Sequence, residues 1–78
     1  RREFVKEEYC VALFHSTSLA LRGEKLCRGE AIAVKLIPVP RHLSSDCGVC
    51  LRFPSAHEER VRALFEGKSL EFDSIVRL

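Results

Sequence analysis

The segment at residues 9–15, YCVALFH, limits the possible folds of this chain more than any other feature. It contains no charged side chain and is rich in residues that favour β-strands. With only 78 residues, the chain can bury one small core. An uncharged, strand-forming segment in such a core is typical of a central strand that is covered on at least one face. The rest of the fold is therefore expected to be arranged around this strand.

A helix is predicted directly after this strand. Ser16, Thr17 and Ser18 are N-cap candidates. Apolar residues then recur at helical spacing as far as about Arg28, and Gly29 marks the end of the helix. The residues expected on its apolar face are Leu19, Ala20, Gly23, Leu26 and Cys27.

Two more strands are predicted in the middle of the chain. Residues 32–39 form the first, and Pro38 places that end at a sheet edge or outside the ladder because proline has no N–H. Residues 40–48 form a polar loop. Residues 49–53 alternate as a half-buried strand does. Its expected faces are Val49, Leu51 and Phe53 on one side, and Cys50 and Arg52 on the other.

The last part of the chain predicts a second helix and a fourth strand. Ser55 as N-cap and Glu58 at the third helical position fit a capping box, and the helix is expected to end near Gly67. Residues 70–78 form the last predicted strand. Its expected common side carries Phe72, Ser74, Val76 and Leu78.

The resulting order of elements, βαββαβ, predicts an α+β protein of the ferredoxin-like type. We expect a four-stranded antiparallel sheet with two helices on one face, formed by residues 9–78 as a single domain. Residues 1–8 are mostly charged and are predicted to be a frayed extension. The exposed strand edges of such a small sheet make a homodimer possible.

Composition excludes several classes of protein. Thirteen basic and eleven acidic residues give a net charge of +2, too balanced to indicate binding to nucleic acid or to an anionic membrane. No apolar run approaches the roughly 20 residues of a membrane span, and the start of the chain lacks the apolar stretch of a signal peptide. No motif for a cofactor is present. The chain contains no methionine, so we expect it to be a processed or trimmed product.

The cysteines lie at positions 10, 27, 47 and 50. An even number would suggest disulfides in a small secreted protein. The lack of a signal sequence and a hydrophobic fraction of 46% favour instead a reduced, cytoplasmic protein. Cys10 and Cys27 have apolar neighbours and are expected to be small buried hydrophobic residues. Cys47 follows a polar loop and is therefore the candidate reactive thiol.

The predicted topology brings the surroundings of Cys47 to one edge of the sheet. The first and third strands are antiparallel neighbours, so the end of the first lies beside the start of the third. The first helix begins at the same edge, with its unpaired N–H groups and the positive end of its dipole. We expect Cys47 to be an exposed thiol whose pKa is lowered from about 8.5 towards neutrality. The other residues expected at this edge are His15, Ser16, Thr17, Arg41, His42, Ser44, Ser45 and Gly48.

Other chemical interpretations of the Cys-x-x-Cys segment are weaker. Three residues of extended chain span about 10 Å, too far for a disulfide unless the segment turns. Cys50 is therefore only a possible second thiol. A single Cys-x-x-Cys is also a weak signal for zinc, and no metal site is expected. The ligands that zinc would need are Cys47, Cys50, His15 and His42. If these residues take no part in chemistry, the histidines are packing or solvated residues and the serines form turns.

Several stretches of the sequence resemble a known family. They are FHST at 14–17, ALR at 20–22 with EKL at 24–26, VKLIPVPR at 34–41, SSDCG at 44–48 and LRF at 51–53. Together they are similar to the small bacterial domain of the selenium/sulfur carrier-like family, over nearly all of residues 9–78. The Pro-x-Pro-Arg…Ser-Ser-x-Cys-Gly element is the most specific part of the resemblance.

The resemblance implies that Cys47 is the carrier cysteine, with Arg41, Ser44, Ser45 and Gly48 as its surroundings. Relatives are expected to have a small apolar residue, usually alanine, in place of Cys50, which argues against a two-thiol mechanism. The family occurs as a stand-alone protein and as the C-terminal part of selenium-metabolism proteins with a sulfurtransferase-like N-terminal domain. The implied partners are therefore sulfur or selenium donor and acceptor proteins.

Two hypotheses of function follow. In the first, Cys47 holds sulfur or selenium as a persulfide or perselenide, Arg41 and the nearby hydroxyls and amides stabilise the anion, and His15 assists proton transfer. In the second, the loop at residues 38–48 recognises a partner or a small anion without catalysis. The first makes the protein a carrier rather than a stand-alone enzyme.

Overall fold

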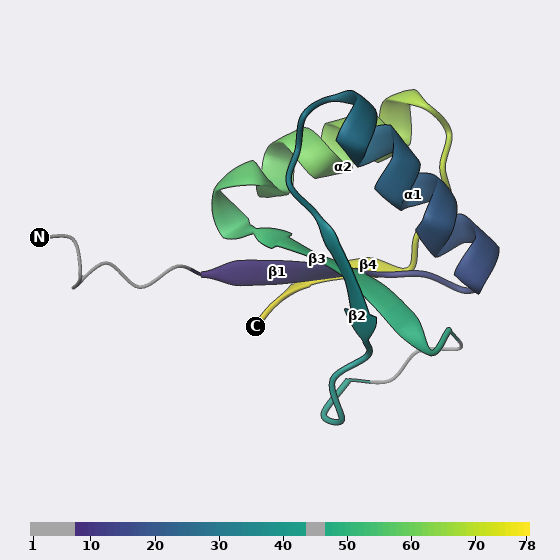
Figure 1. Cartoon of the computed structure of the whole chain (residues 1–78), viewed down its shortest axis with the longest axis vertical. Coiled ribbons are helices and arrows are strands. Elements are labelled where there is room, and N and C mark those ends of the chain that lie inside the picture. The colour runs from purple at the N-terminus through teal and green to yellow at the C-terminus, as the bar shows by residue number, and fades with distance from the viewer. Residues whose placement is uncertain (1–7, 44–46) are drawn as a thin grey trace, which may run out of the picture.

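The computed structural model describes residues 8–43 and 47–78. The predicted extension therefore lies almost entirely outside the described residues, and so do Ser44 and Ser45. The elements run in the predicted order (Figure 1). They are β1 (Tyr9–Leu13), α1 (Thr17–Gly29), β2 (Lys35–Pro38), β3 (Val49–Pro54), the 3₁₀ turn η2 (Ser55–His57), α2 (Glu58–Gly67) and β4 (Ser74–Arg77).

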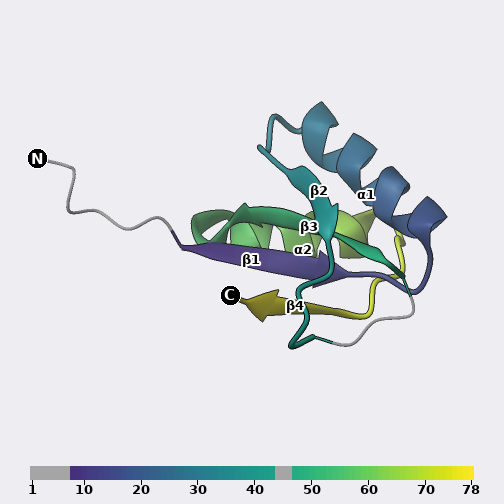
Figure 2. The same ribbon diagram turned by 60° about the horizontal axis from the view of Figure 1, so that its bottom comes forward.

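The strands of the described residues form one antiparallel sheet in the order β2-β3-β1-β4. Figure 2 shows this order, with β4 at one edge and β2 at the other. The uncharged segment is central, as predicted: β1 pairs with β3 through Leu13 opposite Cys50, and with β4 through Leu13 opposite Ser74. The predicted α+β ferredoxin-like βαββαβ arrangement is confirmed.

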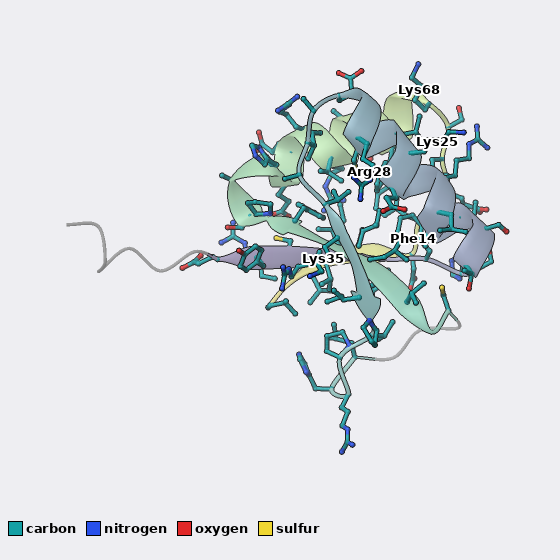
Figure 3. The ribbon with its side chains drawn as sticks, viewed as in Figure 1. Phe14, Lys25, Arg28, Lys35 and Lys68 are labelled. Atoms are coloured by element: carbon teal, nitrogen blue, oxygen red, sulfur yellow. The ribbon has the colours of Figure 1, made fainter. Side chains whose placement is uncertain are left out.

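The helices cover one face of the sheet and enclose the main core (Figure 1). Phe65 of α2 packs against Phe14, with 5.7 Å between the ring centroids, and against Phe72 at 5.5 Å. Phe14 lies between α1 and the sheet (Figure 3). A Cβ placed on Gly23 of α1 would lie 2.9 Å from the Phe14 ring, so only glycine allows the helix to approach this closely. Cys10 and Cys27 are fully buried in this core, as predicted.

The opposite face of the sheet carries a second apolar cluster, formed by Val11, Leu13 and Cys50. No helix of the described residues covers it. Half-buried side chains surround it instead, and two of these, Val39 and Leu43, come from the turn after β2. Figure 1 shows this turn on the side of the sheet away from the helices. The turn is held by a hydrogen bond from Val39 N–H to the Gly48 carbonyl at 3.2 Å.

The start of α2 differs from the predicted capping box. Ser55 is the first residue of η2 and α2 begins only at Glu58, and neither helix has a side-chain hydrogen bond at its N-cap. The reason is that the Glu58 carboxylate is engaged elsewhere. It lies 3.5 Å from the Arg77 guanidinium and 3.6 Å from that of Arg62, and it accepts a long hydrogen bond from the Cys10 thiol.

The predicted alternation of the last strand is also wrong. Phe72 and Ile75 pack with the helix-side core, whereas Val76 packs with the opposite cluster. Leu13 pairs with Ser74, yet its carbonyl also accepts from the Asp73 N–H at 2.7 Å. Two residues thus face one, as in a β-bulge, and this extra residue reverses the side on which Phe72 lies. β1, β2 and β4 are also shorter than the predicted ranges, whereas β3 is one residue longer, and β4 begins at residue 74.

In the part of the chain that the structure describes, no helix has the length and apolar character needed to cross a membrane.

Candidate functional site

Cys47 is almost completely buried. Its exposed fraction is 3%, and it belongs to the helix-side core. The prediction of an exposed thiol is therefore wrong. The physical reason is the period of the strand: Cys47 lies two residues before Val49 and four before Leu51, and all three pack on the face beneath the helices.

The thiol nevertheless lies at the start of α1, as the topology predicted. The Thr17 hydroxyl and the Cys47 Sγ are 3.6 Å apart and can hydrogen-bond in either direction. Thr17 is the first residue of the helix, and Ser16 is its N-cap, with an Oγ that accepts from the Leu19 N–H at 3.3 Å. A sulfur here is close to the positive end of the helix dipole, which favours an anionic form of the bound group.

Three of the other predicted site residues are exposed side chains around the start of α1 and in the turn after β2. His15 is exposed and precedes the N-cap of α1. Arg41 and His42 are exposed in the turn whose neighbours Val39 and Leu43 pack on the helix-free face. The structure thus places the apolar residues of this turn on the face of the sheet opposite to Cys47, and the convergence of Arg41 and His42 with the thiol stays a prediction.

Gly48 is exposed, and apart from its chain neighbours a Cβ at this position would meet no atom within 4 Å. Its carbonyl accepts the Val39 N–H, which extends the β2–β3 ladder by one pair. Gly48 therefore anchors the turn through its backbone.

Cys50 lies on the opposite face of β3 from Cys47. It is fully buried in the cluster with Val11 and Leu13, beneath the turn that carries Leu43. Neither Cys47 nor Cys50 forms a disulfide. Because the strand directs the two side chains to opposite faces, a disulfide would require β3 to lose its extended form.

Burial sets the ionisation of the remaining thiols. Burial raises the pKa of Cys27 to about 11. Burial also raises the pKa of Cys50, and the negative charge of an ionised Cys47 raises it further. Cys10 has its pKa raised by burial first and then by the Glu58 carboxylate. These thiols are held in the neutral form, which is the weaker nucleophile.

Sequence reasoning missed the contacts of Cys10 with Glu58 and of Glu58 with Arg77. They join β1, α2 and β4 at the end of the sheet opposite the start of α1. No local signal could have found them, because Cys10 and Glu58 are 48 residues apart. Within the described ranges, no group of three or more His, Cys, Asp or Glu side chains is placed to hold a metal ion.

In the comparison with family models, residues 9–77 match the family described as "Putative Se/S carrier protein-like". The chain belongs to this family. The match covers every element of the sheet and both helices, so the fold described above is the domain that the family model represents. Searches of the curated proteins and of the solved structures returned no significant match.

Proposed function

We propose that this member of the Se/S carrier-like family carries sulfur or selenium on Cys47. The observation that carries the proposal is the position of the Cys47 Sγ, 3.6 Å from the Thr17 hydroxyl at the N-terminus of α1. Membership of the family supports it independently. The three other thiols are less suited, because each is fully buried and has a raised pKa.

The transfer is a thiol–persulfide exchange. The Cys47 thiolate attacks the outer sulfur of a persulfide on a donor protein, a new S–S bond forms at Sγ, and the S–S bond of the donor breaks. The donor leaves as a thiolate, so electrons balance without an external oxidant. An acceptor thiolate or another nucleophile removes the outer sulfur in the same way, and zero-valent selenium would follow the same steps.

The chain would contribute the environment of the outer, anionic sulfur. The Thr17 hydroxyl and the unpaired N–H groups at the start of α1 supply hydrogen bonds and positive potential. Arg41, Ser44 and Ser45 belong to the proposal as further anion-binding residues and His15 as a proton-transfer group, on the basis of the sequence. Because Cys47 is 3% exposed, loading requires local opening around the thiol.

The experiment is to incubate the protein with a cysteine desulfurase and cysteine and to weigh it intact. We expect a gain of about 32 Da, one sulfur atom, that is removed by a reductant. Cys47→Ser should abolish the gain, whereas Cys50→Ala should retain it, since Cys50 is buried on the opposite face. An equal gain in wild type and Cys47→Ser, or no gain in either, would overturn the proposal.

The burial of Cys47 also favours a second candidate function. In this alternative the turn with the exposed Arg41 and His42 recognises a partner or a small anion, and Cys47 is only a core residue. The alternative expects binding of an anionic partner to survive in Cys47→Ala and to fall in Arg41→Ala. The carrier proposal expects Cys47→Ala to lose transfer while the fold is retained.

The partners in the proposal are donor and acceptor proteins of sulfur or selenium, which a carrier requires by definition. We also propose that the protein works in the cytoplasm. All four cysteines are present as thiols, and a persulfide carrier needs a compartment in which thiols stay reduced. Pull-down from an extract of the native host, followed by sequencing of proteins released by a reductant, would identify the donor.

A further inference from the structure

Two basic residues lie side by side on the helix-free face of the sheet. Lys35 of the edge strand β2 (Figure 3) is directly opposite Arg52 of β3 in the antiparallel ladder. Their chain neighbours Leu36 and Leu51 pack in the helix-side core, so the alternation of the strands directs both basic side chains to the other face. The Cβ atoms of such a cross-strand pair are about 5 Å apart. The two positive charges can therefore contact one small group.

No carboxylate of the described residues neutralises this pair. The ion pairs in that part of the chain involve other basic residues, and neither Lys35 nor Arg52 takes part in one. The other strand residues that alternation directs to this face are uncharged. Like charges directly opposite each other destabilise a sheet. An anion that binds both side chains would therefore relieve a repulsion that the strand pairing imposes.

Tyr9 of β1 fixes the position of the Arg52 guanidinium. The Arg52 Cζ lies 4.5 Å from the centroid of the Tyr9 ring. The stack occupies the flat face of the guanidinium, and the N–H groups at its edge remain able to donate. Because Arg52 is also half-buried, little conformational entropy is lost when these groups bind a ligand.

The charge and the donors of this pair select the chemistry of the anion. The arginine fork donates two parallel hydrogen bonds and the lysine ammonium donates a third. A phosphate monoester carries a charge of about −1.5 to −2 at neutral pH and has three terminal oxygens that accept. A carboxylate or a phosphodiester has a single negative charge and leaves one of the cations unneutralised. We propose that Lys35 and Arg52 form a binding site for a dianionic phosphate group, carried as inorganic phosphate or as the phosphate monoester of a small molecule.

This site is separate from the one in the carrier proposal. Cys47 packs in the helix-side core, on the other face of the sheet. Tyr9 is at the start of β1, whereas α1 and its contact with Cys47 follow the end of that strand. The turn that carries Arg41 follows the end of β2 away from Lys35. The proposal therefore does not depend on the carrier function or on binding at the turn.

An NMR titration of the whole chain tests the proposal. Glycerol phosphate, inorganic phosphate, dimethyl phosphate and acetate are added separately, at constant ionic strength and above the second pKa of phosphate, which is about 6. For glycerol phosphate we expect a dissociation constant of about 1–10 mM, because the site is exposed. The signals that shift should be the Arg52 Nε–H and the backbone amides of Lys35 and Arg52. The ratio of the affinities for glycerol phosphate and inorganic phosphate tells which of the two sources fits the site.

Substitutions of the two basic residues give the second arm of the test. Lys35→Gln and Arg52→Gln each remove one charge and should weaken binding of glycerol phosphate at least about fivefold. Arg52→Lys keeps the charge but loses the fork, so it should recover only part of the affinity. Lys25→Gln, at an exposed residue of α1, is the matched control and should bind like the wild type. Circular dichroism checks the fold, and Lys35→Gln at an exposed position keeps the test valid if Arg52→Gln does not fold.

The singly charged anions decide whether the site is specific. Dimethyl phosphate and acetate should bind at least about fivefold more weakly than glycerol phosphate. Equal binding of all the anions would show an adventitious ion only and would overturn the proposal. The same conclusion would follow from an equal loss of affinity in Lys25→Gln, from shifts confined to the turn that carries Arg41, or from no binding of either dianion.

Discussion

The two faces of the sheet reach the same degree of burial by different means. Phe65 on the helix side and Leu13 on the opposite side are both buried. Phe65 is enclosed by two helices and two other aromatic rings. In the described part of the chain, Leu13 is covered by half-buried side chains from the edge strands and from the turn that carries Leu43, and by no helix. Two equally buried residues can therefore differ in the free energy needed to expose them, because that free energy depends on which parts of the structure must move.

The largest expected effect comes from removing a ring of the helix-side core. Phe65→Ala should lower the free energy of unfolding by about 3–5 kcal/mol, because it leaves a cavity between Phe14 and Phe72 that α2 cannot fill. Leu13→Ala on the other face should cost about 2 kcal/mol, at the lower end for such a change, since the turn can collapse onto it. Urea denaturation of both variants checks the order. An equal or larger loss for Leu13→Ala would contradict the comparison.

The close approach of α1 to the sheet predicts the next effect. Alanine normally stabilises a helix relative to glycine by about 1 kcal/mol. At Gly23, however, the added Cβ would lie 2.9 Å from the Phe14 ring and 3.1 Å from Leu51. We expect Gly23→Ala to lower the free energy of unfolding by about 2 kcal/mol through overpacking. Gly48→Ala is the control, because its Cβ meets nothing within 4 Å, and its thermal midpoint should stay close to that of the wild type.

Alkaline pH should weaken the helix side through Cys27. Burial raises the pKa of this thiol from 9.0 to about 11. The folded state therefore keeps the proton at a pH where the unfolded state has lost it, and the stabilisation is complete below pH 9 and declines towards pH 11. At pH 10, one unit above the unfolded pKa, the expected loss is about 1 kcal/mol.

The measurement for Cys27 is urea denaturation at pH 8 and at pH 10, on wild type and on Cys27→Ala. The difference in unfolding free energy between the two proteins should shrink at the higher pH. The comparison with Cys27→Ala removes the contributions of Cys10 and Cys50, whose pKa values are also raised. A difference that is the same at both pH values would show that Cys27 is not desolvated as described.

The sequence predicted the βαββαβ order and the alternation of β3, because both rest on local periodicity. It also predicted that Cys47 adjoins the start of α1, which follows from topology alone. The burial of Cys47 could have been read from the same alternation, had the strand pattern been extended two residues backwards to include it. The contact of Glu58 with Cys10 and the bulge at Asp73 could not, since each depends on side chains or backbone groups brought together across the sheet.

Leu43→Ala should have the smallest effect on stability and the most specific effect on the reactivity of a buried thiol. Leu43 is half-buried and packs against the cluster on the helix-free face that contains Cys50. Leu43→Ala should therefore lower the free energy of unfolding by only about 1 kcal/mol.

The same variant should raise the rate at which a small alkylating reagent modifies Cys50, because the turn that carries Leu43, and not the sheet, protects that thiol. Modification of Cys27, a residue of α1 that is buried in the other core, should stay at the wild-type rate. Leu21→Ala, at a residue that is 51% exposed on α1, is the control and should alter neither rate. If Leu43→Ala exposed Cys27 and Cys50 equally, the two faces would open as one unit, and the turn would not be a separate cover for the second.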